Sequence, residues 1–250
     1  MSVETYGDGD GDEELPADME VAGVPTTRAL GAGLIALGVG IGVLVPVFIV
    51  AYPAAGLTPA DATNPAVVLP VVATDPVLFS GPAAFEIAVH AIGLVALFGF
   101  WVRFGPTSFL AACATIGGLA WMTLDIVDNA VTFHVLPSIA ADYAAGSPTA
   151  APAFSQLSAL TDAVRLAGHF GGGLWMVGVS VLAIQTRRLP AAIGWAGVIV
   201  GAVFAANLFV PALLNLSFVT VPAWLVILGI GVARTHGTTE AQLMPLMAPA

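Results

Sequence analysis

The sequence predicts an all-α polytopic membrane protein, folded as a bundle of six transmembrane helices. The first observation is composition: 58% of the 250 residues are hydrophobic and 9% are charged, whereas a soluble domain carries about a quarter charged residues. The second is a series of apolar runs of about 20 residues, the length that crosses ~30 Å of hydrocarbon as a helix. The third is the placement of the arginines, which fits six crossings.

An acidic segment precedes the apolar part of the chain. Half of the sixteen acidic residues lie before Val21, in a stretch rich in Gly, Asp and Glu that has no hydrophobic period. This composition is typical of disorder, so we expect residues 1–27 to form a disordered cytoplasmic tail. The transmembrane domain should then cover residues 28–234, followed by a second cytoplasmic tail over residues 235–250.

Composition also excludes two classes of function. The chain contains no lysine and no basic patch, which argues against nucleic-acid binding. The single cysteine, Cys113, rules out an internal disulfide and a cysteine-based metal cluster. The lipid bilayer is therefore the one partner that the composition specifies.

The first predicted span, residues 30–51, is rich in glycine. Gly38 and Gly42 have the spacing of small residues that lets two helix backbones approach closely. Pro46 should kink the helix near its end, and Tyr52 follows at a position suited to an interfacial aromatic residue.

A proline-rich segment, residues 53–82, separates the first span from the second. Its six prolines predict a loop. The apolar piece at residues 66–72 is too short to cross the membrane, and we expect it to lie on the bundle or dip into it. The second predicted span covers residues 83–103.

Four further spans follow. The third, residues 108–136, is long for one crossing, so its end should project beyond the hydrocarbon or the helix should tilt. Thr107 or Ser108 is expected to cap its start, and residues 137–157 predict a loop of small residues. The remaining predicted spans are residues 158–185, 191–210 and 216–233.

The loop arginines predict the orientation of these six spans. All of them fall on one side of the membrane, and the loops of the other side contain no Lys or Arg. The positive-inside rule therefore predicts a multi-pass protein of the cell membrane with both termini in the cytoplasm. These arginines are Arg28, Arg103, Arg187, Arg188 and Arg234.

Polar residues interrupt three of the predicted spans at similar depth, counted at ~1.5 Å per residue. On each span they follow the helical spacing of three or four residues, so each set occupies one helix face. We expect the three faces to line one pocket that opens outward. The candidate site residues are Glu86, His90, Asp125, Asp128, Asp162, Arg165 and His169.

The charges in this pocket do not balance. A charge inside the membrane costs roughly 2.5–3.5 kcal/mol on insertion scales, so such residues usually face the bundle and are paired. Asp162, three residues before Arg165 on one helix, is its nearest partner. The remaining carboxylates carry excess negative charge, which calls for a proton, a metal or water. A buried network that fixes helix register is the alternative to a functional cavity.

The leading interpretation is a pocket that binds a metal or a small ligand. His90, His169, Asp125 and Asp128 are the candidate metal ligands, of types suited to zinc or non-haem iron. The alternatives are a metal-dependent lipid hydrolase, a haem b redox protein ligated by His90 and His169, a transport site, and a structural or partner-binding subunit. The sequence specifies no cofactor, activity or oligomeric state.

Three short motifs carry a resemblance in the second half of the chain. They are R-L-A-G-H at residues 165–169, R-R-L-P at residues 187–190 and I-G-W-A-G at residues 193–197. Over residues 160–233 the chain resembles a family of multi-pass bacterial membrane proteins that is defined as a domain of unknown function. The resemblance implies six or seven spans and carries over no catalytic residue.

Overall fold

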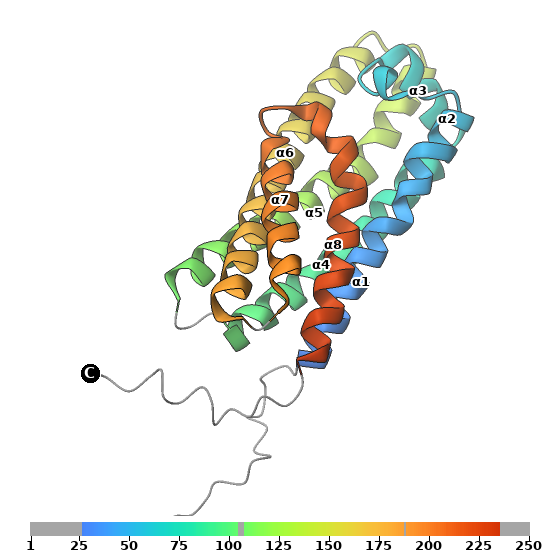
Figure 1. Ribbon diagram of the computed structural model, residues 1–250. Coiled ribbons are helices and arrows are strands. Elements are labelled where there is room, and N and C mark those ends of the chain that lie inside the picture. The colour runs from blue at the N-terminus through green and yellow to red at the C-terminus, as the bar shows by residue number, and fades with distance from the viewer. Residues whose placement is uncertain (1–26, 105–107, 188, 236–250) are drawn as a thin grey trace, which may run out of the picture.

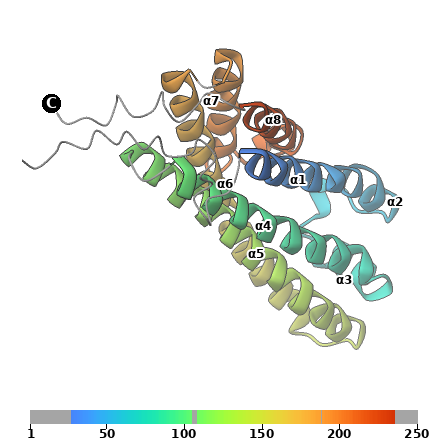
Figure 2. The same cartoon turned by 90° about the horizontal axis from the view of Figure 1, so that it is seen from below.

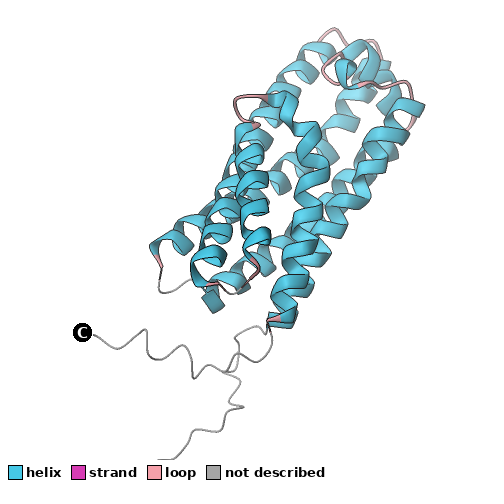
Figure 3. Ribbon diagram, viewed as in Figure 1, coloured by secondary structure: helices cyan, strands magenta, loops and turns pink. Residues whose placement is uncertain are grey.

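The computed structural model describes residues 27–104, 108–187 and 189–235. These residues form helices joined by short loops, and no strand occurs among them (Figure 3). The predictions made for Thr107, for Arg188 and for the tails at residues 1–26 and 236–250 lie outside the described residues. All seven candidate site residues lie inside them.

Five helical segments are long and apolar enough to cross a membrane within the described part of the chain. This confirms the prediction of an all-α membrane bundle. The first segment, Thr27–Ala54, joins α1 (Thr27–Pro46), a π-helical turn η1 (Val47–Ala51) and α2 (Tyr52–Ala54). The other four are α4 (Val77–Phe104), α5 (Phe109–Ala144), α6 (Ala150–Thr186) and α8 (Leu214–Arg234).

Two shorter apolar helices complete the fold. The first is α3 (Pro65–Thr74), which lies between α2 and α4, after a 3₁₀ turn η2 (Pro59–Asp61). The second is α7 (Ala191–Ala206), which corresponds to the fifth predicted span and is followed by a 3₁₀ turn η3 (Pro211–Leu213). Its 16 residues give a length of about 24 Å at ~1.5 Å per residue, which is less than the ~30 Å of a hydrocarbon core.

The helices form a closed ring in the order α1, α4, α5, α6, α7 and α8, and each packs on its two neighbours. Neighbouring helices run in opposite directions along the bundle (Figures 1 and 2). The start of α1 and the end of α8 therefore lie at one end, which we call the proximal end. The turns joining α5 to α6 and α7 to α8 lie at the opposite, distal end (Figure 1).

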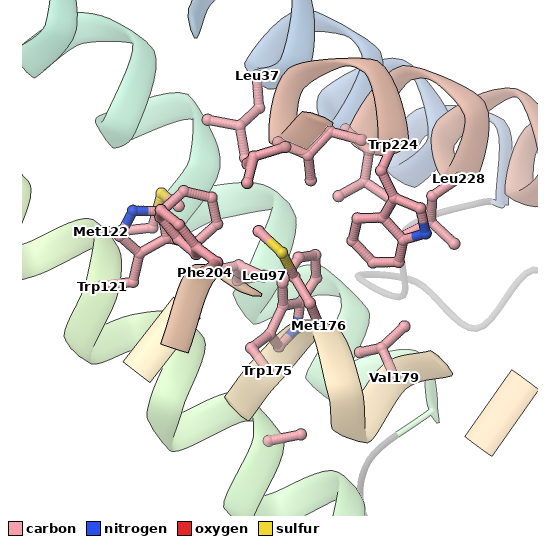
Figure 4. Close-up of a cluster of buried hydrophobic side chains, with 14 of the residues drawn as sticks. Leu37, Leu97, Trp121, Met122, Trp175, Met176, Val179, Phe204, Trp224 and Leu228 are labelled. Carbon is pink, nitrogen blue, oxygen red and sulfur yellow. The ribbon is translucent and has the colours of Figure 1, made fainter. Parts of the chain in front are cut away.

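A cluster of large apolar side chains fills the centre of the ring (Figure 4). Trp121 of α5 and Trp175 of α6 are fully buried, with ring centroids 6.4 Å apart. Trp175 meets Trp224 of α8 edge-on at 6.0 Å. A buried indole N–H needs an acceptor, and Trp224 donates to the Ile193 carbonyl at 3.3 Å. The acceptor for Trp121 lies in the site described below.

The helices extend beyond the predicted spans at the distal end. α4 begins at Val77, α5 continues through Pro137 to Ala144, and α6 begins at Ala150. The predicted loops are therefore wrong in large part. The stretch 53–82 contains α3 as well as the start of α4. The stretch 137–157 contains the end of α5 and the start of α6, and only residues 145–149 form the turn between them.

A second apolar cluster, which we call the apolar cap, explains these extensions. Leu69 and Val72 of α3 are fully buried against Leu136 and Ala140 of α5 and Phe154 of α6. Burial of these side chains stabilises the helix ends, including the end of α5 beyond Pro137. The short apolar piece at residues 66–72 thus lies on the bundle, as expected. With 36 residues, α5 is about 54 Å long and exceeds the thickness of a hydrocarbon core.

Two smaller predictions about helix contacts are also settled. The Ser108 side chain caps α5 by accepting from the Ala111 N–H at 3.4 Å. A Cβ on Gly38 would lie 2.8 Å from the Pro222 carbonyl oxygen of α8, whereas one on Gly42 would make only an ordinary contact at 3.7 Å. The close helix approach predicted for this pair is therefore confirmed at Gly38 and wrong at Gly42.

Candidate functional site

A cavity of about 190 Å³ lies inside the helix ring toward the distal end. One wall comes from α4, α5 and α6 and carries most of the polar side chains. The facing wall comes from the first transmembrane segment and α8 and is mostly apolar. The polar wall consists of Glu86, His90, Asp125, Asp128, Asn129, Thr132, Thr161, Arg165 and His169, with Trp121 at its base.

Six of the seven candidate site residues line this cavity. The exception is Asp162, whose side chain is 41% exposed and is not part of the lining. Arg165 donates to the Asp162 carboxylate, one helical turn earlier. The sequence-based choice of Asp162 as the partner of Arg165 agrees with this contact, and the pair directs its negative member away from the cavity.

Asp125 is the centre of the polar wall. Its Oδ2 accepts from the Trp121 indole N–H at 2.8 Å and lies 3.1 Å from His90 Nε2. The same oxygen lies 4.0 Å from His169 Nε2. Asp125 is only 6% exposed. One buried carboxylate thus lies among side chains from α4, α5 and α6.

The other oxygen of Asp125 faces the backbone of α6. Gly168 leaves the room for it, because a Cβ at this position would lie 2.9 Å from Asp125 Oδ1. Neither Oδ1 nor His169 Nδ1 has a hydrogen-bond partner among the described residues, although both atoms are buried. Buried polar atoms are normally satisfied, so these two atoms are exceptions within the polar wall.

The contacts of His90 define where its proton lies. Its Nδ1 is 2.8 Å from the Glu86 carbonyl oxygen, which can only accept, so Nδ1 carries a hydrogen. Nε2 and the Asp125 carboxylate then share one further proton, because a bare ring nitrogen and a bare carboxylate would repel each other. With the proton on either atom, the His90–Asp125 pair has no net charge.

Asn129 connects two of the three acidic positions of the wall, Glu86 and Asp125. Its side-chain N–H donates to Glu86 Oε2 at 2.7 Å and to the Asp125 carbonyl at 2.9 Å. Asn129 and Trp121 were not among the site residues predicted from the sequence. The signal for both was their spacing, because each lies four residues from Asp125 on the same helix and therefore on the same face.

Asp128 is the one carboxylate of the cavity without a side-chain partner among the described residues. It is 8% exposed and makes no ion pair or side-chain hydrogen bond with another described residue. Since Arg165 is paired with Asp162, and Asp125 with His90, the lining retains the carboxylates of Glu86 and Asp128. Even a positively charged His169 would offset only one of them.

A row of aromatic rings that was not predicted runs along the facing wall and ends at Phe79 of α4. Tyr52 stacks on Phe79 at 5.1 Å and meets Phe48 edge-on at 5.4 Å, and Phe48 stacks on Phe218 of α8 at 5.2 Å. All four rings line the cavity. Phe48 belongs to the π-helical turn that follows Pro46, a type of distortion that frequently occurs at functional sites.

The geometry supports neither the metal site nor the haem considered from the sequence. No three His, Cys, Asp or Glu side chains within the described residues are grouped closely enough to hold a metal ion. The Nε2 atoms of His90 and His169 both approach the same Asp125 oxygen. A haem held by both histidines would have to displace this carboxylate contact.

Inferences about function therefore depend on the geometry of the cavity, since comparisons with known proteins found no match. No protein-family model, curated protein or solved structure matches the chain.

Proposed function

We propose that the protein binds a small cation in the distal cavity. The carboxylates of Glu86 and Asp128 line this cavity, and neither forms an ion pair with another described residue; this observation carries the proposal. An uncompensated charge inside a protein is very costly, and a bound proton or a bound cation would remove that cost.

We also propose that the cavity lies in the outer half of the cell membrane. Arg28, Arg187 and Arg234 lie at the proximal ends of α1, α6 and α8, and the distal loops have no Lys or Arg. By the positive-inside rule the proximal end is cytoplasmic. In this arrangement α7 crosses the membrane as the fifth of six spans, helped by the turn that follows it.

Isothermal titration of the purified full chain tests cation binding. The probes are methylammonium and benzylammonium chloride at constant ionic strength, added to the wild type, to Asp128→Asn and to Asp142→Asn. Asp142 is an exposed carboxylate on the same helix outside the cavity, so it is a matched control. We expect saturable binding of at least one probe, weakened about tenfold or more by Asp128→Asn, because a charged hydrogen bond contributes about 1.5–3 kcal/mol.

Two results would overturn this proposal. One is the absence of saturable binding for both cations. The other is binding that Asp128→Asn and Asp142→Asn leave equally unchanged. In either case the polar wall would be a structural network that fixes the register of α4, α5 and α6.

A further inference from the structure

We infer that the occupant is an organic ammonium ion with a compact apolar body, and not a bare inorganic cation. This inference rests on the proposed cation binding and names the chemical class of the ligand. It follows from four features of the cavity: the division of its walls, the state of its oxygen ligands, its aromatic row, and its size.

The two walls of the cavity differ in chemistry. Carboxylates lie on the α4, α5 and α6 side, whereas Ile41, Leu44, Phe48 and Val221 line the side formed by α1, η1 and α8. A ligand that is charged at one end and apolar at the other would satisfy both walls. A hydrated metal ion would leave the apolar wall facing water, at a cost proportional to the apolar area.

The oxygen atoms are too few and too occupied to surround an inorganic ion. Hard cations such as calcium take six to eight oxygen ligands. Here Glu86 Oε2 already accepts from Asn129, and Asp125 Oδ2 is engaged by Trp121 and His90. An ammonium group needs fewer acceptors, since each N–H forms one directed hydrogen bond.

The aromatic row supplies what an organic cation favours. Cations attached to apolar groups are bound over the faces of Trp, Tyr and Phe, within about 6 Å of the ring centroid. Tyr52 is the middle of the row, stacked on Phe79 and in edge contact with Phe48, so its ring is held in place. Tyr52 is therefore the residue that we expect to favour an organic cation over an inorganic one.

The volume limits the size of the apolar body. An engineered apolar cavity of about 150 Å³ holds one benzene molecule, and this cavity measures about 190 Å³. Typical pockets for drug-sized ligands measure about 300–1,000 Å³. A single ring or a short branched chain with one ammonium group matches this volume.

Three probes of graded chemistry test the inference in the full chain. Benzylammonium has both the charge and the ring, methylammonium has only the charge, and benzyl alcohol has the ring without the charge. We expect benzylammonium to bind at least about tenfold more tightly than either of the others. Tyr52→Leu should reduce this preference over methylammonium, and Tyr52→Phe, which keeps the ring, should retain it.

The outcomes separate this inference from the proposed function. If methylammonium binds as tightly as benzylammonium, and Asp128→Asn weakens both, the inference of an apolar body on the ligand would be overturned and cation binding would stand. Benzyl alcohol binding as tightly as benzylammonium would overturn both, because charge would then contribute nothing. An unchanged preference in Tyr52→Leu would overturn the role of the aromatic row.

Discussion

At the scale of single residues, Asp125 links three helices through one carboxylate. Its Oδ2 is engaged by Trp121 of its own helix and by His90 of α4, while its Oδ1 rests on the α6 backbone at Gly168. An ionised carboxylate suits this position because Oδ2 can accept from both neighbours and neither oxygen donates. An amide of the same shape cannot do so.

We therefore expect Asp125→Asn to destabilise the protein. Either orientation of the amide places an N–H₂ group against Trp121 or at the unpartnered Oδ1 position, and a buried unsatisfied group costs about 1–3 kcal/mol. Thermal unfolding in detergent, followed by circular dichroism, should show a Tm lower by several degrees, at about 2–4 °C per kcal/mol. Asp142→Asn should leave the Tm unchanged, and an equal Tm for both variants would contradict the central role of Asp125.

Residue spacing predicted much of this site. The period of the helix places Glu86, His90, Asp125, Asp128, Arg165 and His169 on inward faces, and all six line the cavity. The aromatic row could not be predicted from residue spacing. Phe48 meets Phe218 only because α1 packs on α8 from the far end of the chain, and no local pattern encodes that contact.

At the scale of helices, the contact between α1 and α8 depends on glycines one heptad apart. A Cβ on Gly31 would lie 2.5 Å from the Gly229 carbonyl oxygen, and one on Gly38 would lie 2.8 Å from that of Pro222. Because both neighbours are backbone atoms, a side chain at either position would force the helices apart. This contact holds the apolar wall of the cavity in place.

Gly38→Ala and Gly42→Ala form a matched pair that tests this contact. The first should destabilise the protein by roughly 1–3 kcal/mol through overpacking. The second meets Pro222 Cβ at an ordinary 3.7 Å and should be neutral or stabilising, since alanine gains up to about 1 kcal/mol over glycine in a helix. Unfolding by SDS would measure both, and a loss of stability as large in Gly42→Ala would refute the assignment.

Helix boundaries were the least predictable part of these elements. Proline lacks an N–H and normally ends a helix, so Pro82 and Pro137 marked the limits of two predicted spans. Both instead lie inside helices. Packing of Leu136 and Ala140 in the apolar cap stabilises the helix beyond Pro137, and that burial depends on α3, which is distant in sequence.

At the scale of the whole molecule, the ring of helices keeps its charged end and its cavity apart. The helix-end arginines gather proximally, and the carboxylates of the cavity lie distally. Composition and apolar runs predicted the all-α membrane bundle, because lipid requires every backbone polar group to be satisfied within a helix. Whether the chain crosses the membrane five or six times depends on α7, which at 16 residues is shorter than a usual span.

Cysteine labelling of intact cells tests the orientation and the six crossings together. In a Cys113→Ala background, which removes the exposed native thiol, a membrane-impermeant maleimide should label Ala145→Cys and Ala212→Cys. Ala191→Cys, at the proximal start of α7, should react only after permeabilisation. If Ala212→Cys instead reacts only after permeabilisation, as Ala191→Cys does, while Ala145→Cys reacts in intact cells, then α7 does not cross the membrane.

The paired ends of α5 and α6 also provide a rigid site for fusing a second domain to this small membrane protein. The two helices stop at a tight turn around the exposed Gly146, whose φ is +80°, and the apolar cap holds their ends together. A helical domain inserted between Ala145 and Ser147 would continue both helices without a flexible linker. Such a fusion would give electron microscopy a landmark for particle alignment, at the end of the molecule next to the cavity.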